Sequence, residues 1–90
     1  MRTRAKIDQN QPAIIDALER NGWMVLSLAP MGRGVPDLLI GGWSARSRKW
    51  VFKLIEVKTT TGTLTPDQIA FQAKGWPVTV IRTVDEALAL

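Results

Sequence analysis

Residues 35–58 read VPDLLIGGWSARSRKWVFKLIEVK, and this stretch decides the fold. It holds two apolar runs, 35–40 and 50–58, which are separated by a pair of glycines and a basic segment. Apolar runs of this length between turn-forming residues are typical of β-strands, and a short connection predicts that the two strands pair as a hairpin. We expect the first strand to end at Gly41-Gly42 and a basic turn over 43–49 to lead into the second.

An acidic residue lies near one end of each expected strand. Asp37 follows Pro36 at the start of the first strand, and the triplet Glu56-Val57-Lys58 closes the second. Because side chains alternate along a strand, Glu56 and Lys58 point the same way, so two carboxylates and an ammonium group can share one pocket. Burying like charges is costly unless a cation compensates, and Mg²⁺ prefers carboxylate oxygen and retained water. The pattern indicates a metal site for phosphodiester chemistry.

Each residue of this pattern has an expected role. Phosphodiester hydrolysis needs an activated water and positive charge near the developing oxyanions. A metal ion held by Asp37 and Glu56 would supply both, and the backbone carbonyl of Val57 could be a further ligand. Lys58 is placed to orient the attacking water or to stabilise charge at phosphorus. The alternative is a charge pair on a solvated face, but Glu56 extends a largely apolar row of alternate residues.

Size and charge indicate the class of partner. Ninety residues make one domain, 1–90, with a basic arm over 1–9, and so small a core makes association with a second copy a reasonable expectation. The net charge of +4 favours a polyanion such as DNA. We expect phosphate contacts from two basic clusters: Arg2, Arg4 and Lys6, and Arg46, Arg48 and Lys49.

Several chemistries are excluded because the chain has no Cys, His or Tyr. Without Cys there is no disulfide framework, thiolate zinc site or cysteine nucleophile. Without His there is no imidazole base, and without Tyr no covalent phosphotyrosine strand transfer. No apolar stretch approaches the roughly 20 residues of a membrane span, and the start of the chain is not signal-like. We expect a soluble, cytoplasmic protein without a membrane partner.

The remaining segments follow from apolar spacing and from capping and turn residues. They predict a helix at about 10–21, a strand at 23–29, a glycine-rich loop at 30–34, a helix at about 65–74, a strand at 76–82 and a helix from 83. The predicted order is α-β-β-β-α-β-α. At the first helix, Pro12 favours Gln11 as the cap, whereas Asp8 with Gln11 would form a capping pair; we prefer the first.

Some residues have two interpretations. Gln68 either closes a capping box with Thr65 or serves the active site, and both can hold. Arg33, between two glycines, is either a solvated loop charge or a phosphate contact. The tryptophans divide in the same way: Trp23 and Trp76 are expected in the core, while Trp43 and Trp50 are left open between a dimer interface and a DNA contact.

Three motifs together resemble the virus-type replication-repair nuclease (VRR-NUC) domain of the PD-(D/E)xK superfamily. They are Gly32-Arg33-Gly34-Val35-Pro36-Asp37, Glu56-Val57-Lys58 and Leu64-Thr65-Pro66-Asp67-Gln68. The resemblance spans about Asp8 to the end of the chain. It implies an α/β fold with a restriction-endonuclease-like core, a mixed sheet flanked by helices, and Mg²⁺- or Mn²⁺-dependent cleavage of DNA. Small members of the family are typically phage or bacterial and resemble dimeric enzymes of replication and repair that act on branched DNA such as four-way junctions.

Carried over by position, Asp37 and Glu56 become metal ligands and Lys58 the catalytic lysine. Gln68 matches the glutamine that begins the family's later helix, and we place it among the catalytic residues. The family pattern often has a glutamate on the first helix, and here the corresponding residue is Gln11, which can coordinate only as a neutral oxygen. This difference either weakens metal affinity or moves the role to Asp8.

Two other functions stay open. A non-catalytic DNA-binding module could keep the nuclease fold without activity, and the Gln11 difference supports that alternative. A sequence-specific restriction enzyme of the same superfamily is the third possibility, but ninety residues leave little room for a recognition element.

Overall fold

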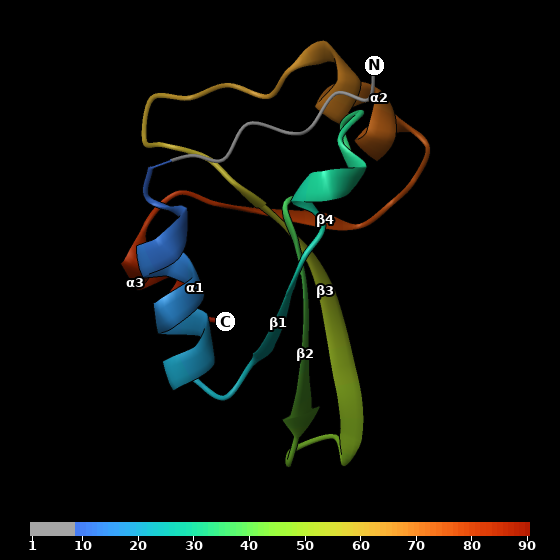
Figure 1. The fold of residues 1–90 in the computed structure, drawn as a ribbon. Helices are drawn as coiled ribbons and strands as arrows, with labels where there is room; N and C mark the ends of the chain where they lie inside the picture. Colours follow the sequence, from blue (N-terminus) through green and yellow to red (C-terminus); the bar gives the residue numbers. More distant parts are fainter. Residues whose placement is uncertain (1–8) are drawn as a thin grey trace.

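The computed structural model describes residues 9–90 as one mixed sheet flanked by helices (Figure 1). The elements are α1 (Gln11–Arg20), β1 (Met24–Ser27), a 3-10 turn η1 (Ala29–Met31), β2 (Leu38–Ser44), β3 (Lys49–Val57), α2 (Pro66–Ala73), β4 (Val78–Ile81) and α3 (Val84–Leu88). The sheet order is β1-β2-β3-β4; the first two pairings are antiparallel and β3–β4 is parallel. The predicted order of helices and strands is confirmed, and the architecture is an α/β fold of the restriction-endonuclease-like kind.

The central hairpin forms as predicted, but its first strand is shifted along the chain: β2 begins at Leu38 instead of residue 35 and continues to Ser44. β2 and β3 pair from Leu38↔Ile55 to Ser44↔Lys49, and the turn occupies 45–48. The prediction that the strand ends at Gly41-Gly42 was wrong, because both glycines lie inside β2 beneath aromatic rings. A Cβ would lie 3.0 Å from the Phe52 ring at Gly41 and 2.9 Å from the Trp23 ring at Gly42. Here glycine makes room for a ring instead of ending a strand.

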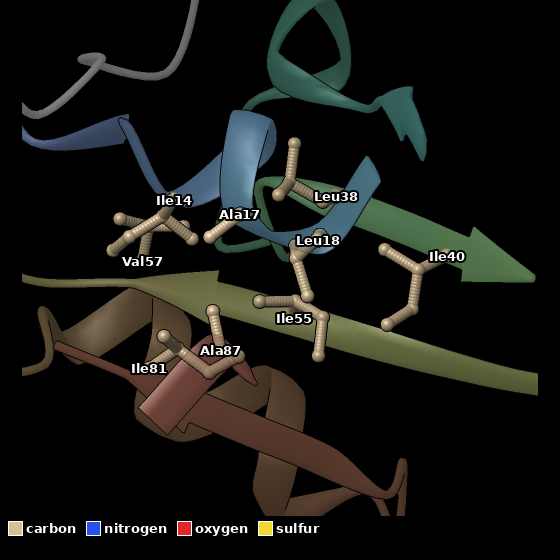
Figure 2. Packing of buried hydrophobic residues seen from close by; sticks show 9 residues of the cluster. All are labelled: Ile14, Ala17, Leu18, Leu38, Ile40, Ile55, Val57, Ile81 and Ala87. Atoms are coloured by element: carbon tan, nitrogen blue, oxygen red, sulfur yellow. The ribbon is translucent and has the colours of Figure 1, made fainter. Parts of the chain in front are cut away.

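The core lies between the sheet and the helices α1 and α3, which cover the same face (Figure 1). Figure 2 shows its nine buried residues: Ile14, Ala17, Leu18, Leu38, Ile40, Ile55, Val57, Ile81 and Ala87. The spacing of Ile14, Ala17 and Leu18 puts all three on one stripe of α1. Each fully buried aliphatic side chain contributes about 1.5–3 kcal/mol relative to its exposed state, so this layer fixes the sheet against α1.

Three local predictions were wrong. The N-cap of α1 is Asn10, and Gln11 is the first helical residue, because Pro12 is accepted anywhere in the first turn. The expected strand at 23–29 stops at Ser27, whose Oγ accepts from the N–H of Ala29 as the chain turns into η1.

Trp76 is not in the core, which is the third difference. It is 54% exposed and stacks on Phe71, with ring centroids 5.6 Å apart and an interplanar angle of 13°. The expected strand at 76–82 begins only at Val78, after Pro77, so Trp76 stays in the connection from α2. Trp23, as expected, packs against the core.

Candidate active site

Two buried carboxylates lie side by side where β2 begins and β3 ends. The register closes with Leu38↔Ile55, so Asp37 comes opposite Glu56 one step further along the two strands. Asp37 is 4% exposed and Glu56 is 2% exposed. Oδ2 of Asp37 accepts a hydrogen bond from the backbone N–H of Val57 at 2.8 Å, which ties the first carboxylate to the strand that carries the second.

The glycine-rich loop before Asp37 packs directly on the first turn of α2. Gly34 has a φ of +80°, and a Cβ there would lie 2.2 Å from the carbonyl oxygen of Asp67. Only glycine combines this backbone conformation with so close an approach. Arg33, beside it, is exposed and also has a positive φ of 54°. Gly34 therefore brings together the loop that ends at Asp37 and the helix that carries Gln68.

Gln68 uses both ends of its side-chain amide. Its Oε1 accepts a hydrogen bond from the backbone N–H of Thr65 at 2.9 Å. The backbone N–H of Gln68 donates to Oγ1 of Thr65 at 3.2 Å, so the predicted capping box is present. The Nε2 end donates to Oε2 of Glu56 at 3.1 Å. The cap thereby sets the orientation of the amide that holds the second carboxylate. Gln68 thus closes the capping box and contacts Glu56, so its two sequence-based interpretations are compatible.

Lys58 comes directly after the Glu56-Val57 pair. Its backbone N–H donates to the carbonyl oxygen of Ile81 on β4 at 3.0 Å, so the extended backbone continues one residue past β3. Because side chains alternate along extended backbone, the Lys58 side chain lies on the same face as that of Glu56. The loop beyond it is held by Arg82, whose Nη1 donates to the carbonyl of Thr59 at 2.7 Å and to that of Gly62.

The start of α1 is fixed against the same end of the sheet. The side-chain amide of Asn10 donates to the carbonyl oxygens of Lys58 at 3.0 Å and Arg82 at 3.1 Å. The next residue, Gln11, is 3% exposed, and within residues 9–90 its Oε1 accepts no hydrogen bond. A buried carbonyl-type oxygen without a donor is costly unless something else satisfies it. Asp8, the other candidate at this end, lies outside the described residues.

Oxygen atoms make up the possible metal ligands. The carboxylates of Asp37 and Glu56 could be joined by the amide oxygen of Gln11 and the backbone carbonyl of Val57. In the described part of the chain, no three or more His, Cys, Asp or Glu side chains gather closely enough to hold a metal ion. An ion here would take two carboxylates, neutral oxygens and water, a ligand set suited to Mg²⁺ or Mn²⁺.

The basic cluster of the hairpin turn does not join this site. Arg46, Arg48 and Lys49 are exposed at the β2–β3 turn, the end of the hairpin opposite Asp37 (Figure 1). At about 3.4 Å per residue, the length of β2 separates them from the carboxylates by roughly 20 Å. Arg33 is at the site end of the sheet. The cluster Arg2, Arg4 and Lys6 lies outside the described residues.

Sequence reasoning missed two residues that hold the site together, Asn10 and Arg82. Both donate side-chain hydrogen bonds to backbone carbonyls far away in the chain. Such contacts depend on how α1 and β4 meet the end of β3, and no local sequence pattern predicts them. The only signal for Asn10 is its place one residue before the helix.

Comparison with known proteins gives one match. A family model described as the VRR-NUC domain matches residues 28–83, more than half of the chain. This segment includes the glycine-rich loop, both carboxylates, Lys58 and Gln68. No curated protein and no solved structure matches. Over residues 9–90, no helix has the length and apolar character needed to cross a membrane.

Proposed function

Because the chain belongs to the VRR-NUC domain family, we propose that it is a DNA endonuclease that hydrolyses phosphodiester bonds with Mg²⁺ or Mn²⁺. Membership of this family implies a nuclease-type function in DNA processing. The identity of the metal, the roles of the individual residues and the DNA substrate are our proposals. The observation that carries the proposal is the pairing of Asp37 and Glu56, both buried, at the joined ends of β2 and β3. Two neighbouring carboxylates at the joined ends of two strands offer the oxygen ligands that a divalent cation prefers.

The residues at this end of the sheet fit a divalent ion. Asp37 and Glu56 supply charge, and the buried Oε1 of Gln11, which accepts no hydrogen bond from residues 9–90, supplies a neutral oxygen. Val57 offers its backbone carbonyl as a further ligand. When bound, the ion would acidify a water molecule and neutralise negative charge on the scissile phosphate.

The protein's own groups would position the reactants. The Val57 N–H orients the Asp37 carboxylate, and the Gln68 amide orients that of Glu56. Gln68 therefore acts in this proposal by holding a ligand. Lys58, on the face of the strand that carries Glu56, would orient the attacking water or place positive charge beside the phosphorus.

The proposed substrate is branched DNA, such as a four-way junction, in replication or repair in a bacterial or phage-infected cell, and the proposed active form is a homodimer. These details rest on the family resemblance. The net charge of +4 supports a polyanionic substrate. Arg33 at the site, and Arg46, Arg48 and Lys49 at the hairpin turn, are the proposed phosphate contacts.

The test compares labelled four-way junctions with linear duplexes, in Mg²⁺, in Mn²⁺ and in a chelator. We expect cleavage only with metal, and Asp37→Asn or Lys58→Ala should lower it at least about a hundredfold while DNA binding and folding stay intact. Asp16→Asn is the matched control, because Asp16 is an exposed acid paired with Arg20 at 2.9 Å on α1. Unchanged cleavage by Asp37→Asn would refute the assignment of this site.

The competing function is a non-catalytic DNA-binding module. One observation favours it: Gln11 stands, uncharged, where the family pattern often has a glutamate. The same experiment separates the two functions, since a non-catalytic module would retain DNA affinity and show no cleavage of either DNA in either metal.

A further inference from the structure

In residues 9–90, no helix covers most of one face of the sheet (Figure 1). Alternation along the strands puts a set of large apolar side chains on the face opposite α1 and α3. We call it the bare face: Met24, Leu26, Leu39, Trp43, Trp50 and Phe52. It is continuous, because the register joins its members across three strands. Within the described chain, α2 reaches only the end of this face, where Gln68 meets Glu56 (Figure 1).

The bare face is exposed to an unusual degree for such side chains. Phe52 is 64% exposed, Met24 and Leu26 are each 58% exposed, and Trp43 and Trp50 are about as open. Trp43 and Trp50 meet edge to face, with ring centroids 5.6 Å apart. Side chains of this size cover about 150–250 Å² each when buried, so the face leaves roughly 600 Å² of apolar surface open, at the upper limit for a monomer.

We propose that the bare face is the surface through which two copies of this chain associate. Its open area approaches the roughly 800 Å² that each partner contributes to a standard interface. The six residues of the bare face are all uncharged: Lys53 alternates to the opposite face of β3, and the charged Glu56 and Lys58 lie beyond the six, at the end of β3 that α2 approaches. Each copy carries a net charge of +4, and an uncharged area such as this one lets two copies approach without local charge repulsion.

The shape of the bare face suits a second copy of itself. A hollow of about 160 Å³ lies over Gly41, where β2 has no side chain, and is lined by Met24, Leu26, Leu39 and Phe52. A cavity of about 150 Å³ accepts a benzene ring. One face therefore carries both ring-sized space and protruding aromatic rings, as a two-fold symmetric interface requires. DNA is a poorer occupant of these six positions, because phosphate contacts come mainly from Lys and Arg and none of the six residues is basic.

The proposal gives the homodimer suggested above a specific surface, and it is tested without DNA or metal. Sedimentation equilibrium of the full chain would be measured from about 1 to 100 µM, a range in which micromolar association is visible. We expect dimers for the wild type. Phe52→Glu, and independently Leu26→Glu, should weaken association at least about thirtyfold, as loss of a central interface residue does. Leu88→Glu on α3 is the matched control, since Leu88 is 48% exposed on the helical side, and it should leave the dimer intact.

Circular dichroism and thermal unfolding would show that the variants are folded. Because the two substitutions lie on different strands, local misfolding of one strand could not explain the loss of association in both variants. A wild type that sediments as a monomer throughout the range would overturn the proposal. So would dimers that survive both substitutions, or dissociation by Leu88→Glu as well. If Phe52→Glu impairs DNA binding by a protein that is always monomeric, the face contacts nucleic acid and the proposal is wrong. A monomeric wild type would also remove the proposed dimeric active form. The assignment of Asp37 and Glu56 as metal ligands is tested separately, by the cleavage assay with Asp37→Asn.

Discussion

Gly34→Ala is expected to destabilise this protein far more than Gly22→Ala, although both glycines have positive φ. The left-handed backbone costs an alanine about 1–2 kcal/mol at either position. At Gly22 (φ +91°) a Cβ meets nothing within 4 Å, whereas at Gly34 (φ +80°) it would lie 2.2 Å from the backbone oxygen of Asp67. Overpacking of this kind typically costs a further 1–3 kcal/mol or so, because the loop must move away from α2. We expect losses of about 1–2 kcal/mol for Gly22→Ala and about 2–5 kcal/mol for Gly34→Ala.

Urea unfolding followed by tryptophan fluorescence measures both losses. A domain of this size has about 5–15 kcal/mol of stability, so Gly34→Ala should still fold in the cold but melt well below the wild type, at about 4–8 °C per kcal/mol. Folded Gly34→Ala should also cleave DNA at least about tenfold more slowly, since small displacements of catalytic groups are costly, while Gly22→Ala cleaves normally. Equal destabilisation by the two alanines would mean that the loop and α2 are not in the close contact described.

Two further predictions concern the metal and DNA. Gln11→Glu should raise Mg²⁺ affinity by about tenfold or more, because a carboxylate replaces a neutral oxygen, and isothermal titration calorimetry with the metal alone measures it; unchanged affinity would show that residue 11 is no ligand. Replacing Arg46, Arg48 and Lys49 together by Gln should weaken binding of every DNA tested and reduce the salt slope by about 2–3, measured by fluorescence anisotropy from low to moderate salt. An unaltered slope would show that the turn does not contact phosphate.

The sequence predicted those parts of the fold that depend on neighbouring residues. Alternation and turn composition located the β2–β3 hairpin, and the Thr65 capping box formed as expected. The same alternation put Glu56 near Asp37, because strands of known register bring defined residues together. These predictions succeeded since each rests on one strand pair or one helical turn.

The rest could not be predicted because it depends on contacts between distant elements. Gly41-Gly42 looked like a strand end, and only the positions of Trp23 and Phe52 explain why the strand continues. Trp76 was assigned to the core because it adjoins an expected buried strand, but its ring stacks on Phe71 instead.

The candidate site shows the same limit. Its acids could be read from the sequence, whereas the hydrogen bonds from Asn10 and Arg82 arise only when α1 and β4 meet β3. The distance between the basic turn and the carboxylates likewise follows from the direction of the hairpin.

The hydrogen bond from the Val57 N–H to Asp37 has a consequence for the unfolded and nascent protein. The donor is a peptide group, so the aspartate is oriented by strand registry and not by the identity of any side chain at position 57. A slip of one residue between β2 and β3 would turn Leu38 toward solvent and at the same moment withdraw the acid from its partner. On the proposed mechanism, a chain still emerging from the ribosome or a misfolded copy has no working site. Such an enzyme would be harmless to the genome of its host until the hairpin has closed correctly.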